Sequence, residues 1–206
     1  MDETNLLSTQ LADIQTQLSQ LSSQLAQVNA QLGQIPVLSE KVTQLEDNLL
    51  LIGDIHRYEK LKNYLANHQW WEADQETIRL IVDISGHKEI EDLTPNDIQK
   101  FPCNDLGVID RLWLNYSQGH FGFSVQVGIY QELGGTVETT VAQNRELIEL
   151  WGERLGWRSN NQWHKCNELD YSLNAPVGCH PSRWWNSPYG SRMTNNFLSR
   201  LITCKR

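Results

Sequence analysis

Two arginines and three aromatic residues stand close together near the C-terminal end of the sequence, as Arg183, Trp184, Trp185, Tyr189 and Arg192. A guanidinium group binds a carboxylate through two parallel hydrogen bonds, and aromatic rings cover flat apolar surfaces. These residues therefore predict a site for a flat, apolar ligand that carries carboxylates. The alternative is that Trp184 and Trp185 fill the domain's own core, because paired tryptophans lower solubility unless they pack or bind something.

Charge is distributed unevenly along the 206 residues, whose formal net charge is -8. Residues 151–206 hold eight bases, three acids and five of the eight tryptophans, so this end is both cationic and aromatic. An acidic protein is a poor match for a phosphate backbone, so nucleic acid is not the expected ligand. The cationic end fits a carboxylated ligand, and it fits solvated bases over an aromatic core as well.

Signatures of catalysis are missing from the sequence. It contains no GxxxxGK[ST], GxGxxG, HExxH or GxSxG motif. Its six histidines are scattered without the spacing of metal ligands, and its acidic clusters have no partner that sequence alone identifies. We therefore expect a binding protein with no enzymatic activity and no metal centre.

The cysteines and the apolar runs bear on the compartment. Cys103, Cys166, Cys179 and Cys204 have no CxxC spacing and are too few for a disulfide scaffold. No recognisable export signal stands at the start, and no apolar run approaches the roughly 20 residues of a membrane span. We expect reduced thiols and a cytoplasmic protein.

The first 53 residues form a helical extension with a narrow apolar stripe. The stripe follows steps of three and four residues through Leu11, Ile14, Leu18, Leu21, Leu25, Val28, Leu32 and Ile35. This spacing is typical of a coiled coil, although the flanking positions are uncharged and select no partner. Pro36 interrupts the pattern, which resumes from Leu38 to Ile52. Either residues 11–52 form a homo-oligomeric coiled coil, or two helices fold back near residues 33–36 as a hairpin.

Residues 54–206 predict a compact all-α domain of six to seven short helices. Apolar residues at helical spacing indicate helices near residues 55–65, 78–85, 105–116 and 125–133. Thr94 followed by Pro95 predicts the start of a short helix that reaches about Lys100. Thr139 or Thr140 is expected to open a helix through Trp151, and Thr194 to cap the last one. Residues 168–173 are the segment expected to pair briefly as a strand.

Four sequence segments together resemble one known family. They are Trp71-Glu-Ala-Asp-Gln-Glu-Thr77, Phe101-Pro-Cys-Asn-Asp-Leu106 with Ile109-Asp-Arg-Leu-Trp113, Phe121-Gly-Phe-Ser-Val-Gln126 with Ile129-Tyr130, and Gly156-Trp-Arg158 with Trp163, Ala175 and Pro176. In this order they resemble the genomes-uncoupled family, which are tetrapyrrole-binding regulators of magnesium chelatase in chlorophyll biosynthesis. The resemblance runs from about Asp54 to Pro181, and an N-terminal helical extension is a feature of cyanobacterial-type members.

The resemblance implies a fold, a ligand and a partner. The domain of residues 54–206 would be a cupped bundle of helices, without catalytic activity, whose concave face binds protoporphyrin IX or Mg-protoporphyrin IX. Its partner would be the large porphyrin-binding subunit of magnesium chelatase, and the protein would be cytoplasmic, either free or peripheral at a thylakoid or other membrane surface. The expected ligand contacts are Leu112, Phe123, Val125, Gln126, Ile129, Tyr130, Arg183, Trp184, Trp185, Tyr189, Arg192 and Phe197. Part of this set must be plain core, because the helix near 125–133 has to bury one side. Trp71, Ala73, Asp74 and Thr77 are expected to be structural, through close packing, capping or an interhelical hydrogen bond.

One departure from the family pattern lies beside the expected site. After Ala175-Pro176 the family usually continues Gly-His-Leu-Pro, whereas this chain has Gly178-Cys179-His180-Pro181. Cys179 and His180 are also potential axial ligands of a haem iron. The alternative function is therefore an oligomeric sensor or scaffold that uses the same fold for a bilin, a haem or a peptide partner.

Overall fold

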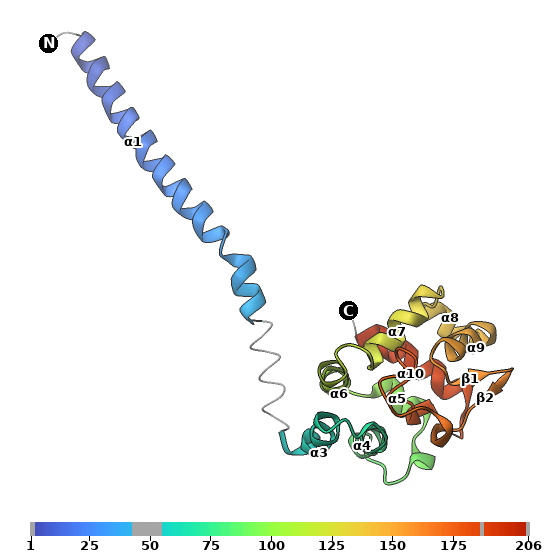
Figure 1. The fold of residues 1–206 in the computed structure, drawn as a ribbon. Coiled ribbons are helices and arrows are strands. Elements are labelled where there is room, and N and C mark those ends of the chain that lie inside the picture. The colour runs from blue at the N-terminus through green and yellow to red at the C-terminus, as the bar shows by residue number, and fades with distance from the viewer. Residues whose placement is uncertain (1–2, 43–54, 186–187, 205–206) are drawn as a thin grey trace. The chain divides into compact units, whose positions relative to one another are not determined.

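The computed structural model describes residues 3–42, 55–185 and 188–204 (Figure 1). The chain divides into two compact units, Met1–Ile52 and Gly53–Arg206. Within the described residues, no helix is both long and apolar enough to cross a membrane.

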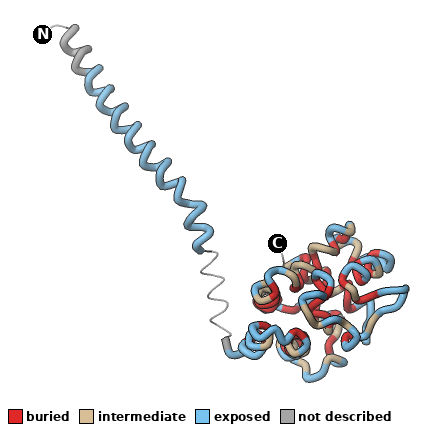
Figure 2. The backbone as a smooth tube through the Cα atoms, in the orientation of Figure 1, coloured by how far each residue is buried: buried red, intermediate tan, exposed pale blue. Residues whose placement is uncertain are grey.

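The first unit is helical, with α1 (Glu3–Leu32) followed by a turn at Gly33 and Gln34 and by further helix over residues 35–42. Pro36 lies in the first turn of this second stretch, where its missing N–H breaks no hydrogen bond. The apolar stripe is uncovered by any described part of this unit, with Leu11 60% and Leu21 67% exposed (Figure 2). The apolar residues past the turn are uncovered as well, and Leu38 is 55% exposed.

The second unit is built almost entirely of helices, as the sequence predicted. Its elements are α3 (Ile55–Ala66), α4 (Trp70–Ile84), the 3-10 helix η1 (Ile90–Asp92), α5 (Pro95–Lys100), α6 (Cys103–Tyr116), α7 (Phe123–Glu132), α8 (Val137–Val141), α9 (Arg145–Arg154), the antiparallel strands β1 (Arg158–Ser159) and β2 (Gln162–Trp163), the 3-10 helices η2 (Cys166–Glu168) and η3 (Arg183–Trp185), and α10 (Ser191–Cys204). Eight of these elements in the described residues are α-helices, against six to seven predicted.

The additional helix comes from a break that the sequence analysis missed. Residues 137–154 form α8 and α9, which begin at separate caps, Thr136 and Asn144. Gln143 between them has a φ of 50°, so one continuous helix cannot pass through it. Asn144 caps α9 by accepting a hydrogen bond from the Leu147 N–H at 3.1 Å.

Other helix boundaries separate correct predictions from wrong ones. Thr94 caps α5 as predicted, within a reciprocal capping box that Asp97 completes. The prediction that Thr194 caps the last helix was wrong, because α10 begins at Ser191 and Thr194 lies inside it. The strand prediction at 168–173 was also wrong. The one strand pair in the described residues turns at Asn160 and Asn161, both with positive φ.

The core is aromatic and centres on α10, which packs against α5, α6, α7 and α8. Trp113, Trp151, Trp157 and Trp184 are all at most 2% exposed, and Figure 2 shows the buried residues gathered inside this unit. Between α4 and α6, the Trp113 indole N–H donates to Thr77 Oγ1 at 2.9 Å. This is the interhelical hydrogen bond predicted for that segment.

Two cysteines are not the reduced thiols that the sequence predicted. Cys103 and Cys204 form a disulfide that joins the first residue of α6 to the last residue of α10. Their sequence separation is 101, so no local spacing reveals the pairing. Cys166 and Cys179 are free and buried.

Candidate functional site

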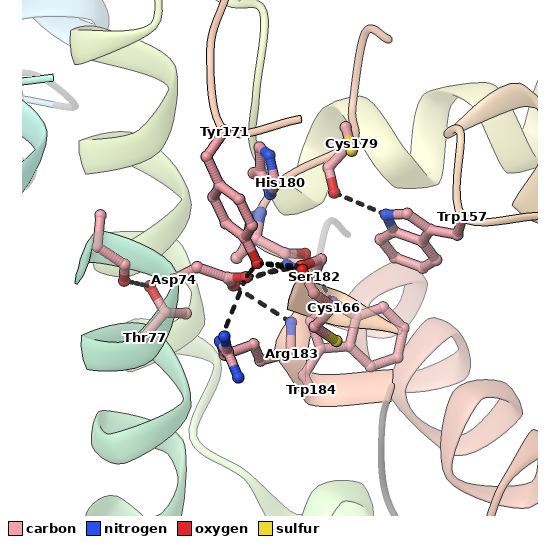
Figure 3. Close-up of polar contacts among 12 residues, drawn as sticks. Asp74, Thr77, Trp157, Cys166, Tyr171, Cys179, His180, Ser182, Arg183 and Trp184 are labelled. Atoms are coloured by element: carbon pink, nitrogen blue, oxygen red, sulfur yellow. Dashed lines mark hydrogen bonds and ion pairs between the residues drawn. The ribbon is translucent and has the colours of Figure 1, made fainter. Parts of the chain in front are cut away.

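The segment that carries the predicted arginine and tryptophans is fixed to α4 by one buried carboxylate. Asp74, on the second turn of α4, is 1% exposed. Its side chain points toward the segment 180–183, and Figure 3 shows Tyr171, Ser182 and Arg183 converging on it. A carboxylate buried to this degree is costly unless several donors satisfy it.

Four hydrogen bonds satisfy the Asp74 carboxylate. Oδ1 accepts from the Ser182 N–H at 2.7 Å and from the Arg183 N–H at 3.2 Å. Oδ2 accepts from the Ser182 hydroxyl at 2.6 Å and from the Tyr171 hydroxyl at 3.0 Å. Asp74 therefore fixes the backbone at the point where η3 begins.

The Arg183 side chain packs back onto the same face of α4. Its guanidinium carbon lies 4.2 Å from the centre of the Trp71 ring, within cation–π distance. The Arg183 Nε is 4.0 Å from Asp74 Oδ2. With the Gln75 amide oriented so that its oxygen faces the guanidinium, that oxygen accepts hydrogen bonds from Arg183. The Arg183 side chain remains 19% exposed, so part of the guanidinium is open to solvent.

The segment 178–181, where the chain departs from the family pattern, is held through its main chain. The Gly178 N–H donates to His120 O at 2.8 Å, and the Gly122 N–H donates to His180 O at 3.0 Å. The Gln126 amide donates to Gly178 O at 2.9 Å and to Pro181 O at 2.8 Å.

Two tryptophan indoles complete this main-chain fixation. Trp157 donates to Cys179 O at 2.7 Å, and Trp184 donates to Pro181 O at 3.1 Å. Together with the amide of Gln126, they bind carbonyls on both sides of His180. Neighbouring elements therefore fix the path of this segment through its peptide groups, while the His180 ring packs against the rings of Trp113, Phe121 and Tyr171.

Trp184 is part of the core, as the alternative interpretation of the paired tryptophans predicted. Its ring stacks on Phe197 of α10 at 4.2 Å between centroids, with 18° between the planes. Trp157 and Trp151 lie 5.8 Å and 6.2 Å from it. Trp185 follows in η3, but its side chain lies outside the described part of the structure.

The remaining predicted contacts fall into two groups. Five are buried: Leu112, Phe123, Gln126, Tyr130 and Phe197. Val125 and Ile129, on α7, are half-buried, and Tyr189 and Arg192 are exposed. Val125 and Ile129 lie beside Gly178, where an added Cβ would meet their side chains at 3.4 Å and 3.1 Å. The accessible members of the predicted set are thus the α7 pair, the two arginines and Tyr189.

Arg192 lines one cleft, whereas Arg183 contacts two residues that line another. Arg192, in the first turn of α10, opens onto a polar cleft of about 250 Å³ whose other residues are Gln99, Thr140, Val141, Gln143, Asn195, Asn196 and Ser199. The Trp71 and Gln75 side chains that contact Arg183 border a cleft of about 310 Å³ between α3 and α4, with Lys60, Tyr64, Glu72, Glu76 and Arg79. In the sequence, the two arginines flank residues 184–191.

Burial also sets the protonation of the groups around Asp74. It raises the pKa of the Cys166 thiol to about 11 and that of Cys179 to about 12, with the Asp74 charge adding to both. Burial lowers the pKa of His180, so this imidazole is neutral, and its Nε2 lies 2.8 Å from Asp170 O. Cys179 and His180 are 1% and 0% exposed, so neither is presented to a haem at the surface.

Sequence reasoning missed three residues of this site. No pattern in the sequence assigned a role to Ser182, Tyr171 or Gln75. Each acts through a contact with a residue about 100 positions away, Ser182 and Tyr171 with Asp74 and Gln75 with Arg183. Asp74 was placed in a quoted motif but was expected only to cap or to bond another helix. No group of three or more histidines, cysteines and carboxylates that could hold a metal ion occurs among the described residues.

The comparison with protein families decides the relationship. The model of the GUN4-like family matches residues 53–200, which is most of the chain and includes all of the site described above. The chain belongs to the GUN4-like family. The resemblance inferred from the four sequence segments is thereby confirmed.

Relatives and a solved structure agree with this assignment. A Ycf53-like protein from Synechocystis sp. is 30% identical over 124 residues, which cover 59% of this chain and 48% of the relative. The chloroplastic tetrapyrrole-binding protein of Arabidopsis thaliana is 36% identical over 75 residues, covering 35% of this chain and 28% of that protein. The chain thus matches about half or less of the length of these curated relatives.

The GUN4-like fold itself is supported by structure. The ligand-free structure of Arabidopsis thaliana GUN4 superposes with a TM-score of 0.55 at 24% identity, and the match covers 71% of this chain and 94% of that one. The all-α architecture of the second unit is therefore the architecture of this family.

Proposed function

We propose that this GUN4-like chain binds a tetrapyrrole, protoporphyrin IX or Mg-protoporphyrin IX, without transforming it. The observation that carries the proposal is the fixed segment 178–184, which begins beside Val125 and Ile129 of α7. In the sequence it continues into residues 184–191, which Arg183 and Arg192 flank. A porphyrin is a broad apolar disc with two propionates on one edge. Guanidiniums suit the propionates, and apolar side chains suit the disc.

Within this proposal, the predicted contact residues have two roles. The accessible ones would touch the ligand: Val125, Ile129, Arg183, Tyr189 and Arg192, together with Trp185. The buried ones would support them from beneath: Leu112, Phe123, Gln126, Tyr130, Trp184 and Phe197. The name of the Arabidopsis relative, a tetrapyrrole-binding protein, supports the ligand class.

The regulatory part of the proposal concerns magnesium chelatase. A protein that binds the substrate or the product of this chelatase, and carries no catalytic machinery of its own, can act by delivering or sheltering the pigment. We propose that the chain stimulates the chelatase in chlorophyll biosynthesis through the large porphyrin-binding subunit. The apolar stripe of residues 11–52 would pair copies of the chain, which would present more than one ligand domain to the partner.

The alternative occupants of the same site are a bilin, a haem or a peptide. Burial of Cys179 and His180 disfavours a haem held through either as an axial ligand. A bilin shares the propionates of a porphyrin but not its rigid disc, so it separates charge recognition from shape recognition.

The deciding experiment is a titration of the full-length chain with protoporphyrin IX, its magnesium complex and a bilin. Saturable one-to-one quenching of tryptophan emission, with a shifted Soret band, is the expected result for the porphyrins. Chelatase activation is then measured with the same preparations. Porphyrin binding no tighter than that of an unrelated helical protein would overturn the proposal.

A further inference from the structure

The disulfide Cys103–Cys204 joins α6 to α10, and α10 carries residues of the predicted ligand set. Cys103 is the first residue of α6, and Cys204 is the last residue of α10, the helix that carries Arg192 and Phe197. We propose that this disulfide is a redox-sensitive clamp, whose reduction loosens α10 and weakens ligand binding. The effect on ligand rests on the proposed function, whereas the loosening of α10 does not.

The disulfide is accessible, unlike the two free thiols. Cys103 and Cys204 are half-buried, whereas Cys166 is 2% and Cys179 1% exposed. Burial keeps the two free thiols protonated at neutral pH, and only a thiolate attacks a disulfide. Exchange with an external dithiol is therefore favoured over internal reshuffling, and accessible disulfides are commonly the labile, regulatory ones.

A small cavity lies against the disulfide. Its volume is about 80 Å³, and besides the two cysteines it is lined by Leu106, Gly107, Asp110, Phe123, Ser124, Val127 and Leu201. Two thiols need more room than one disulfide. The cavity supplies this room without displacing a core side chain, so reduction is compatible with a folded domain.

The contacts that connect the clamp to the ligand site run along α10 and α7. Phe123, at the cavity wall, lies 5.3 Å from Phe197, and Phe197 stacks on Trp184 at 4.2 Å. Trp184 in turn donates to Pro181 O, in the segment fixed by Asp74 and Gln126. A shift of α10 therefore changes the packing of the Trp184 ring, at the end of the segment 178–184.

Other contacts limit how far α10 can move. Gln99 donates to Asn196 at 2.5 Å, and the Arg200 Nε donates to Phe101 O at 2.8 Å, so α5 still holds α10 after reduction. Met193 and Leu198 are 0% exposed and stay in the core. The expected change is a loosened helix with weaker binding, and not an unfolded domain.

The chemistry of release requires a dithiol as the reductant. One thiolate of the dithiol attacks a sulfur of the disulfide, which forms a mixed disulfide and releases the other cysteine as a thiolate. The second thiol of the reductant then displaces the bound cysteine. Two electrons pass to the protein, leaving Cys103 and Cys204 as thiols and the reductant as a disulfide.

The first test uses the full-length chain, oxidised or reduced with dithiothreitol, and needs no ligand. Thiol titration of the denatured, unreduced protein should find two reactive cysteines; four would overturn the proposal. Amide hydrogen exchange should then rise across residues 191–198 on reduction. A rise confined to the turns that contain Cys103 and Cys204 would show that the disulfide controls nothing beyond itself.

The second test measures protoporphyrin IX affinity in both redox states. Reduction should weaken binding about fivefold, the lower end of typical coupling between sites. If the oxidised and the reduced protein both bind the porphyrin with equal affinity, the clamp proposal is overturned. If neither form binds, the proposed function fails, and hydrogen exchange alone decides whether the clamp exists.

A double variant separates the disulfide from the buried thiols. Cys103→Ser/Cys204→Ser should bind like the reduced wild type and should ignore dithiothreitol. A response of this variant to the reductant would assign the effect to Cys166 or Cys179 and overturn the proposal. If the variant does not fold, the comparison of oxidised and reduced wild type stands by itself.

Discussion

Asp74 and Ser182, 108 residues apart in sequence, are joined by two hydrogen bonds, from the serine N–H at 2.7 Å and from its hydroxyl at 2.6 Å. These two hydrogen bonds hold the start of η3 against α4. Because the carboxylate is buried, its removal affects both the stability of the domain and the position of the segment that it holds.

Replacing the Asp74 carboxylate should be strongly destabilising. Asp74→Ala leaves the Ser182 N–H and hydroxyl without their acceptor and leaves the Tyr171 hydroxyl with Cys166 O alone, at a cost of about 3 kcal/mol in the free energy of unfolding. Urea denaturation measures this change. Asp83→Ala, at an exposed position on the same helix, should stay within about 0.5 kcal/mol of wild type. A similar value for both variants would show that the buried contacts contribute little.

The two arginines should respond differently to substitution. Arg192→Ala, at an exposed position, should weaken protoporphyrin IX about tenfold without changing stability, whereas Arg183→Ala should also lower stability by removing the contact with Trp71. Titration with the dimethyl ester of the porphyrin tests the charge, since esterification should cost wild type more affinity than it costs Arg192→Ala, which keeps only Arg183. Arg154→Ala, at a side chain 62% exposed on α9, is the control.

Acid should destabilise the domain through His180. Because burial lowers its pKa in the folded state, the unfolded chain binds a proton first as the pH falls. The stability is fully present above the unfolded pKa of about 6.5 and falls below it, by up to about 1.4 kcal/mol per pH unit. His180→Leu, which introduces the residue usual in the family pattern, should flatten the dependence between pH 7 and pH 5. Denaturant midpoints across this range for both proteins decide the matter, and parallel curves would exclude His180 as the cause.

Two glycine-to-alanine changes should have opposite signs. Gly178 has a φ of +77°, and a Cβ there would lie 2.8 Å from Leu155 Cδ2, so Gly178→Ala should cost about 1–2 kcal/mol or more. Gly128, inside α7, has nothing within 4 Å of a Cβ, and Gly128→Ala should stabilise by about 0.5–1 kcal/mol. Thermal unfolding of both variants tests the argument, which fails if Gly178→Ala is neutral.

The N-terminal stripe should determine the oligomeric state. Leu25 is 65% exposed within its unit, and Leu25→Lys places a charge in the middle of the proposed helix–helix seam. Sedimentation equilibrium should give the monomer mass for this variant and a multiple of it for wild type. Ser23→Lys adds the same charge to the opposite side of the helix and should leave the mass unchanged. A monomeric wild type would remove the basis for self-association.

The parts of the fold that were predicted correctly depend on local sequence. Helical spacing of apolar residues located α3, α6, α7 and the second half of α4, although α4 begins at Trp70 and not near residue 78. The Thr94-Pro95 pair located the start of α5, because the cap and the residues it bonds lie within four positions. The break at Gln143 was missed, since a glutamine with positive φ carries no signature of a turn. The disulfide and the bonds between Asp74 and Ser182 were missed because they connect residues about 100 positions apart.

Composition singled out residues 183–192 but could not divide their side chains between core and surface. Trp184 and Arg192 are eight positions apart in a stretch whose sequence shows no clean period, and Trp184 is buried before α10 begins, whereas Arg192 is exposed in its first turn. The difference follows from Phe197 and Trp157, which cover Trp184 from distant elements. Sequence patterns report which side of a regular helix is apolar, and they carry no such information for an irregular segment.

The main-chain fixation of residues 178–181 has an evolutionary consequence. His120, Gly122, Gln126 and Trp157 bind peptide groups there, and main-chain N–H and C=O groups stay in place when a side chain changes. What limits replacement at position 180 is the aromatic cage around the imidazole, whose ring centre lies 4.4 Å from that of Tyr171 and 4.9 Å from that of Phe121. A side chain that fills this cage can replace the histidine without shifting the path of the chain, whereas a larger or a charged one cannot.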